Sequence, residues 1–167
     1  VTWGDSNRVG PSVSRAGGKG INVARVLTQA GFGAHAIAAV GHDDIHAFEN
    51  DLRSVPHTLI SDPNGRARRS IAVVEDPGAT RVTLFNEVGH VVSDTVWSEL
   101  VDVTTERSAS ATCLVIAGSL PPQFDLERIS DLIASADRRD RLRVRRARSG
   151  RRSRRRPAHA PAAPWWP

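Results

Sequence analysis

Residues 16–27 read Ala-Gly-Gly-Lys-Gly-Ile-Asn-Val-Ala-Arg-Val-Leu, a glycine-rich loop that runs directly into an apolar helical pattern. The three glycines allow a tight turn and a close approach to a ligand, because they carry no Cβ atom. The spacing predicts a helix that starts at Gly20 and closes at Gly31. Its predicted apolar face consists of Val23, Val26, Leu27 and Ala30. Such a loop points backbone N–H groups and partial positive charge at an anionic or hydroxyl-rich ligand.

Two common nucleotide-binding loops do not fit this stretch. The P-loop requires Ser or Thr after its lysine, whereas Gly20 follows Lys19, and no strand-like run precedes the loop as the dinucleotide-binding fingerprint requires. A glycine-rich turn before a core helix is the simpler interpretation. It leaves Lys19 unexplained, because the helix dipole disfavours a cation at this end. The candidate ligand-binding residues here are Gly17, Gly18, Lys19 and Asn22.

Strands and helices alternate along the chain up to about residue 136. The expected elements are a strand at 34–40, a helix to about residue 53, a hairpin of 71–75 with 80–85, a helix capped by Ser93, a strand at 113–117 and a helix over 126–133. The strands at 34–40 and 113–117 are continuously apolar, which predicts burial on both faces and makes Cys113 a small buried residue. This alternation is typical of a parallel α/β fold.

Charge is divided unevenly along the chain. Residues 1–136 carry 11 basic and 16 acidic side chains, whereas residues 137–167 carry 12 basic and 2 acidic ones. The net charge of +5 therefore comes from the C-terminal segment and not from the α/β domain. No signal peptide and no long apolar span is visible, so we expect a cytoplasmic protein without membrane contact.

Three segments resemble a known family in the order in which that family has them. Residues 16–27, closed by Gly31, resemble the N-terminal signature of ribokinase-like (PfkB) carbohydrate kinases, closest to the 1-phosphofructokinase and tagatose-6-phosphate kinase branch. Residues 66–71 resemble its Thr-Arg-x-x-Ile segment, and residues 117–122 resemble its Ser-Gly-Ser-Leu-Pro-Pro turn. The resemblance implies a truncated α/β fold, a partial ribokinase-like three-layer sheet over residues 5–136, with a small β lid whose strands lie near 7–15 and 68–86.

The resemblance also implies a substrate site. By this resemblance Arg68 would enter the sugar site and bind the phosphate that the substrate already carries. Without the resemblance, Arg66, Arg68 and Arg69 are better interpreted as the solvated edge of a hairpin. Ser119 follows the strand at 113–117, at the carboxyl edge where ligands gather in open α/β sheets. The intact reaction would be ATP-dependent, with Mg²⁺, and would phosphorylate fructose 1-phosphate or a similar ketohexose phosphate. A homodimer formed through the lid is a further implication.

The catalytic half of this family's pattern is missing from the sequence. The family's Gly-x-Gly-Asp loop supplies the aspartate that deprotonates the acceptor hydroxyl, and the backbone amides that stabilise the transferring phosphoryl group. No aspartate follows Asp140 and no glycine follows Gly150, so no residue is assigned as catalytic and no nucleotide site is expected. The histidines at 42, 46 and 57 show no metal-ligand spacing. We therefore expect an inactive chain; a non-catalytic fragment that binds a sugar phosphate is the alternative.

The segment 137–167 has a different composition. Twelve arginines lie between Arg138 and Arg156, followed by a Pro- and Ala-rich end that contains Trp165 and Trp166. One account is a disordered basic arm that binds nucleic acid non-specifically, by counterion release and stacking. The other, which we favour, is a shifted reading frame in GC-rich DNA, because the chain has 22 arginines and one lysine. Both accounts predict that 137–167 is not a folded part of the domain.

Overall fold

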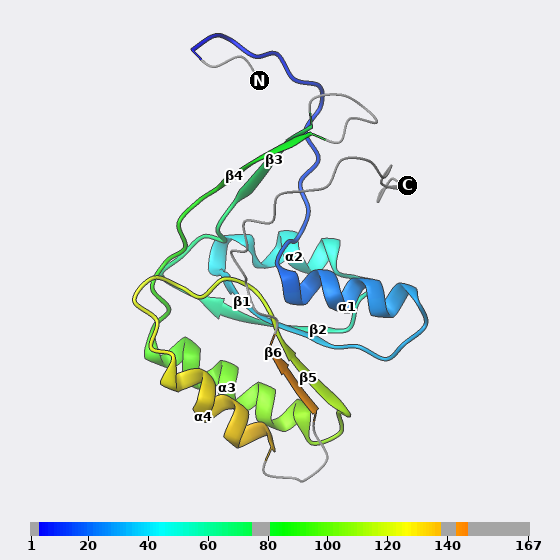
Figure 1. Cartoon of the computed structure of the whole chain (residues 1–167), viewed down its shortest axis with the longest axis vertical. Coiled ribbons are helices and arrows are strands. Elements are labelled where there is room, and N and C mark those ends of the chain that lie inside the picture. Colours follow the sequence, from blue (N-terminus) through cyan, green and yellow to red (C-terminus); the bar gives the residue numbers. More distant parts are fainter. Residues whose placement is uncertain (1–3, 75–80, 138–142, 147–167) are drawn as a thin grey trace, which may run out of the picture. The chain divides into compact units, whose positions relative to one another are not determined.

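The computed structural model describes residues 4–74, 81–137 and 143–146, and for residues 137 and 143–146 it describes the backbone alone (Figure 1). The described residues fall into two units. The main unit comprises residues 14–67 together with the described part of 89–149. The smaller unit, which we call the lid unit after the lid predicted from the sequence, comprises residues 4–13 together with the described part of 68–88. The mixed α/β architecture confirms the predicted fold class.

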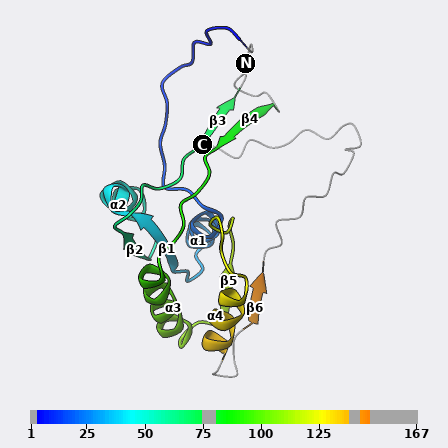
Figure 2. The same cartoon turned by 90° about the vertical axis from the view of Figure 1, so that its left-hand side faces the viewer.

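The main unit is built on two pairs of parallel strands. The first pair is β1 (Ala36–Gly41) with β2 (His57–Asp62), and the second is β5 (Cys113–Ile116) with β6 (Arg143–Arg146). The helices are α1 (Lys19–Gln29), α2 (Ile45–Asp51), α3 (Asp94–Ser108) and α4 (Glu127–Asp137), and a 3₁₀ turn, His42–Asp44, precedes α2. Figures 1 and 2 show α1 and α2 on one face of β1–β2 and α3 on the other, which gives three layers.

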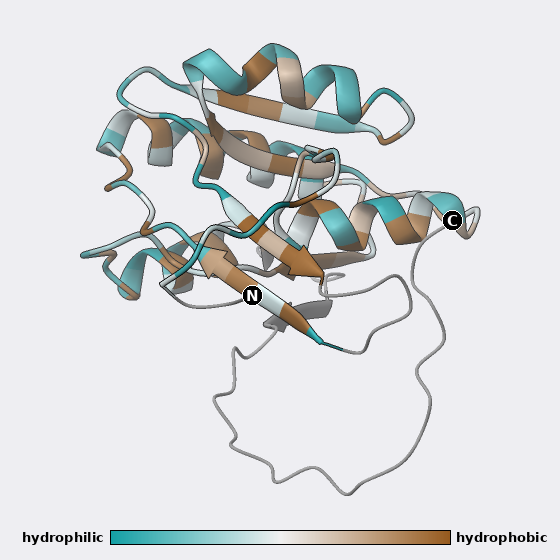
Figure 3. Ribbon diagram, turned by 90° about the horizontal axis from the view of Figure 1, so that it is seen from above, coloured by the Kyte–Doolittle hydropathy of each residue, from teal (hydrophilic) through white to brown (hydrophobic). Residues whose placement is uncertain are grey.

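The core of the main unit lies between α1, α2 and the first strand pair. Its buried members are Ala16, Ile21, Ala24, Ala36, Leu52 and Val55. Leu52 is completely buried and Ile60 nearly so. Burial of one such side chain stabilises a fold by about 1.5–3 kcal/mol, so this cluster contributes to holding α1 against the sheet. Figure 3 shows hydrophobic and hydrophilic residues interspersed along the helices.

Helix α1 buries a different face from the predicted one. Ile21 and Ala24 point into the core, whereas Val26 is 62% exposed and Val23 and Leu27 are also exposed. The prediction was wrong because α1 is apolar on two sides, and spacing alone does not say which side meets the sheet. The predicted closure at Gly31 is confirmed, with a φ of 80°. The Gly31 and Phe32 N–H groups donate to the carbonyls of Thr28 and Leu27, as in a Schellman motif.

The second strand pair corrects two predictions. Strand β5 is not buried on both faces: Cys113 is exposed and Val115 is 40% exposed. Residues 143–146, assigned to an unfolded tail, instead form β6 in parallel register with β5, from Cys113 opposite Arg143 to Ile116 opposite Arg146. Strand pairing needs only backbone N–H and C=O groups, which an arginine-rich segment also supplies. Of residues 147–167, none is among the described residues.

The lid unit contains an antiparallel hairpin. Strand β3 (Ser70–Val74) pairs with β4 (Val82–Asn86), from Ser70 opposite Asn86 to Val74 opposite Val82, which confirms the predicted hairpin. Its predicted turn lies outside the described residues. Beyond β3 and β4, Arg69 and Glu87 are joined twice, by the Arg69 N–H to the Glu87 carboxylate at 2.9 Å and by the Glu87 N–H to the Arg69 carbonyl at 3.0 Å. The predicted lid strand near 7–15 is wrong, because this segment has no regular structure and is exposed up to Arg15.

Candidate functional site

The glycine loop ends in a helix N-terminus without a side-chain cap. Gly18 is the N-cap of α1 with a φ of 119°, a conformation that L side chains rarely adopt, so glycine is required there. The Gly18 carbonyl accepts the first helical hydrogen bond from the Asn22 N–H at 2.9 Å. The preceding N–H groups of the first turn have no partner within the helix and point toward the loop. Lys19 and Asn22 are both exposed beside these donors.

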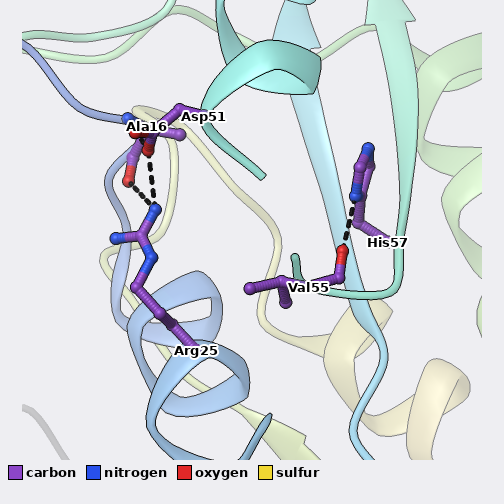
Figure 4. A network of polar contacts seen from close by, with 5 residues as sticks. All are labelled: Ala16, Arg25, Asp51, Val55 and His57. Atoms are coloured by element: carbon purple, nitrogen blue, oxygen red, sulfur yellow. Dashed lines mark hydrogen bonds and ion pairs between the residues drawn. The ribbon is translucent and has the colours of Figure 1, made fainter. Parts of the chain in front are cut away.

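A polar network holds the start of this loop (Figure 4). The Asp51 Oδ2 atom accepts the Ala16 N–H at 2.9 Å and the Arg25 Nη2 at 2.7 Å. The same guanidinium nitrogen donates to the Ala16 carbonyl at 3.4 Å. The loop is thus tied at one end to α1 and to the last residue of α2. Sequence reasoning missed this network, because Arg25 and Asp51 are 26 residues apart and neither belongs to a motif.

The start of α1 lies beside the end of β5. A Cβ atom added at Gly20 would stand 3.8 Å from the Ala117 carbonyl oxygen. Gly118 follows with a φ of 134°, and then the exposed Ser119. The structure therefore brings together the two segments that carry Gly17, Gly18, Lys19, Asn22 and Ser119, although they are about a hundred residues apart in the sequence. Their meeting point is the carboxyl end of a parallel strand, the usual ligand position in such sheets.

The carboxyl ends of β1 and β2 are fixed by a close backbone contact. A Cβ atom at Gly41 would lie 2.1 Å from the Gly65 carbonyl oxygen, so this position admits only glycine. Asp62, 8% exposed, accepts the Asn64 N–H at 3.0 Å and so stabilises the turn that follows β2. The Asp44 Oδ2 atom accepts the Ala67 N–H at 2.7 Å. These contacts fix the chain immediately before Arg68.

Arg68 itself is the first residue of the lid unit after this anchored segment, and it is exposed. Its assignment to the substrate phosphate rests on the resemblance of residues 66–71 to the family segment and stays a proposal.

The described histidines lie on the main unit without forming a ligand set. The pKa of His35 is lowered, first by partial burial and then by electrostatic repulsion from Arg107 and from His57. His35 Nε2 hydrogen-bonds Thr58 Oγ1 at 2.8 Å, and His57 Nδ1 donates to the Val55 carbonyl at 2.7 Å (Figure 4). His35 directly precedes β1, and His57 is the first residue of β2. Among the residues that the structure describes, no three His, Cys, Asp or Glu side chains are grouped so that they could hold a metal ion.

Comparison with known proteins identifies the family. The family model for pfkB family carbohydrate kinases matches residues 2–163. The chain belongs to this family. The match includes most of the segment 137–167 that the composition separates as a tail.

Solved structures of pfkB-type kinases share the fold. Phosphofructokinase-2 from Escherichia coli in complex with fructose-6-phosphate is 28% identical with a TM-score of 0.75, over 87% of this chain and 48% of that one. The tetrameric inhibited form of the same enzyme gives 28% and 0.75, over 86% and 47%. A possible 1-phosphofructokinase from Thermotoga maritima, at 23% identity and a TM-score of 0.68, covers 87% and 48% and shows the fold alone. The chain thus spans about half the length of the solved structures it matches.

Membership of a kinase family implies ATP and, typically, Mg²⁺. Within the described residues no group of three or more His, Cys, Asp or Glu side chains could hold a metal ion, and the given sequence contains no Gly-x-Gly-Asp loop, so no residue is assigned to ATP or Mg²⁺. In the same part of the chain, every helix is too short or too polar to cross a membrane.

Proposed function

We propose that this chain binds a phosphorylated ketohexose, with fructose 1-phosphate as the first candidate, and that it does not phosphorylate it. The observation that carries the proposal is the position of the uncapped start of α1 beside the end of β5, where a Cβ on Gly20 would meet Ala117 at 3.8 Å. This arrangement places unpaired N–H groups at the carboxyl edge of a strand. The complex of the Escherichia coli relative with fructose-6-phosphate supports a ketohexose phosphate as ligand.

Each candidate residue has a chemical role in this proposal. The N–H groups around Gly17 and Gly18 donate to hydroxyl or phosphate oxygens, because the helix dipole favours an electron-rich partner there. Lys19 adds a positive charge, Asn22 offers an amide to a sugar hydroxyl, and Ser119 offers a hydroxyl from the β5 side. Arg68 binds the substrate's phosphate, since a guanidinium presents a planar fork of donors to an oxyanion.

Binding without catalysis follows from the residues that the chain lacks. Phosphoryl transfer to a hydroxyl needs a base within hydrogen-bond reach and donors for the transferring group. In the family the Gly-x-Gly-Asp loop supplies both, and the sequence contains no such loop. In this proposal the chain is a cytoplasmic sugar-phosphate-binding fragment of a kinase fold.

Calorimetric titration of the purified chain tests this function. Fructose 1-phosphate and fructose 6-phosphate should each release heat with saturation, whereas fructose itself should bind at least about tenfold more weakly, because it offers no phosphate to charged donors. Gly18→Ala should weaken binding, since a side chain is strained at its φ of 119°. Gly33→Ala is the matched control, because a Cβ there meets no atom within 4 Å. Equal Kd values for fructose and its phosphates would contradict the proposal.

Self-association through the hairpin is a second proposal. Val74, Val82 and Leu84 of β3 and β4 are more than half exposed. Because Val74 stands opposite Val82 and Ala72 opposite Leu84, these apolar side chains share one face of the hairpin, and a contiguous exposed apolar surface is typical of a contact site. A second copy that covers this surface would give a homodimer. Light scattering should show a dimer that Leu84→Asp converts to a monomer; a monomer before the substitution would contradict the proposal.

The basic segment supports a separate candidate function, nucleic-acid binding. Twelve arginines lie within residues 138–156. Binding through them should weaken steeply between about 50 mM and about 200 mM salt, because neutralised phosphates release counterions. Removal of residues 147–167 takes away about half of these arginines and leaves β6 in place, so it should reduce the salt slope. An unchanged slope would exclude this role.

A further inference from the structure

Arg25 and Asp51 connect the start of the glycine loop to helices α1 and α2. One carboxylate oxygen of Asp51 accepts both the Ala16 N–H at 2.9 Å and the Arg25 guanidinium at 2.7 Å, and the guanidinium also reaches the Ala16 carbonyl at 3.4 Å. Both polar groups of the Ala16 backbone are therefore held by this pair. Figure 4 shows the Arg25 side chain directed from α1 toward Ala16 and Asp51.

Helix stability does not account for this arrangement. Asp51 is the last residue of α2, where the helix dipole disfavours a carboxylate. The two side chains retain 19% and 26% of their exposure, and an ion pair that is partly open to solvent contributes little to global stability. Three glycines in four residues leave residues 17–20 with many accessible conformations, so the loop needs an external restraint to hold one of them.

We propose that Arg25 and Asp51 are positioning residues, which hold Ala16 so that Gly17, Gly18 and Lys19 present their N–H groups to the sugar phosphate. This inference rests on the proposed function for its ligand. Neither residue touches the substrate in this proposal; both act through the backbone of Ala16. Arginine is suited to the task because its planar fork reaches a carboxylate and a carbonyl at once, whereas a lysine ammonium is a single point of charge.

Substitutions that remove or alter the fork test the inference by titration with fructose 1-phosphate. Arg25→Ala and Asp51→Ala should each raise the Kd by about tenfold. The freed loop would sample several conformations, so a smaller fraction of the molecules would hold the conformation that binds the ligand. Arg25→Lys should recover part of the loss, since it keeps the charge and loses the fork. The matched control is Arg128→Ala, which breaks the Arg128–Asp94 ion pair between α4 and α3 and should leave the Kd unchanged.

Amide hydrogen exchange gives a readout that needs no ligand. In Arg25→Ala the amides of Ala16 and Asn22 should exchange at least about tenfold faster, because their bonds hold the loop and the first turn of α1. The amide of Ile60, deep in β2, should keep its rate, which separates local loosening from general destabilisation. Should Arg25→Ala fail to fold, the same exchange rates are measured in Arg25→Lys, where we expect smaller changes in the same direction.

The two readouts separate this inference from the proposed function. If the unaltered chain binds no sugar phosphate, the proposed function fails, and the exchange rates alone decide whether the pair positions the loop. If the chain binds and the Arg25 variants bind equally well, the inference is wrong and the proposed function stands. Unchanged exchange at Ala16 and Asn22 in Arg25→Ala would also overturn it, as would parallel acceleration at Ile60.

Discussion

Gly41 shows how a single residue sets the geometry around the site. A Cβ atom there would stand 2.1 Å from the Gly65 carbonyl oxygen and 2.5 Å from the Arg66 Cα, and these backbone atoms cannot turn aside as a side chain could. Gly41→Ala should therefore lower the free energy of unfolding by about 1–3 kcal/mol through overpacking. Gly33→Ala, with no atom within 4 Å of the added Cβ, should be near neutral in the same denaturant titration. Equal stabilities of the two variants would contradict the close approach of Gly41 to Gly65.

His35 gives the main unit a pH dependence. Its pKa is lowered in the fold by burial, Arg107 and His57, so the unfolded chain binds its proton more readily. The stability that neutral His35 contributes is complete above its ordinary pKa of about 6.5 and is lost as the pH falls through that value toward the folded pKa. Chemical denaturation between about pH 7.5 and about pH 5 should show stability falling on acidification, with a shallower slope in His35→Gln. An identical slope in both proteins would refute this role.

At the scale of the element, the sequence predicts that α1 is a helix, but only its packing decides which face of the helix is buried. Ile21 is buried in the core, whereas Val26 is 62% exposed. Ile21→Ala should cost about 2–4 kcal/mol through lost burial and a cavity, while Val26→Ala should change stability by less than about 0.5 kcal/mol. Thermal unfolding of the two variants measures the difference. If the face predicted from spacing alone were the buried one, Val26→Ala would cost more stability than Ile21→Ala, and that result would contradict the structure.

Features that depend on neighbours in the sequence were predictable. The closure of α1 at Gly31, the β3–β4 hairpin and the Ser93 cap, whose Oγ accepts the Val96 N–H at 3.3 Å, all follow from local chemistry. Strand β2 was missed because Leu59 and Ile60 form too short an apolar run, and its burial arises from pairing with β1.

The candidate site divides in the same way. Its glycine loop and the turn after β5 were recognisable as motifs in the sequence. Asp44 and Ala67 are 23 positions apart, and Arg25 and Asp51 are 26 positions apart. No local sequence pattern predicts contacts over such separations. Such contacts become visible only once the parallel strands bring their carboxyl ends together.

At the scale of the whole molecule, the feature to explain is the arginine-rich sequence of the segment after α4, which a shift of the reading frame could produce. Residues 143–146 pair with β5 in parallel register, and the family match runs to residue 163, so the family pattern extends into the arginine-rich segment. We propose that the arginine-rich sequence comes from a shifted frame. The gene, read with a one-base shift after the codon for about residue 136, should encode apolar strands and then a Gly-x-Gly-Asp loop. Absence of that loop from all three frames would contradict the shift and favour a native basic arm.

Sugar-phosphate binding without phosphoryl transfer is the central claim, and one phosphorus NMR experiment tests both halves of it. The purified chain is mixed with fructose 1-phosphate, ATP and MgCl₂, and the spectrum is followed over time. We expect the fructose 1-phosphate resonance to shift or broaden in proportion to the protein, with no bisphosphate or ADP signal, because loss of even one oxyanion donor can cost about a hundredfold in rate and the base is missing as well. Growth of bisphosphate and ADP signals together, or a sugar-phosphate resonance that the protein leaves unchanged, would contradict the claim.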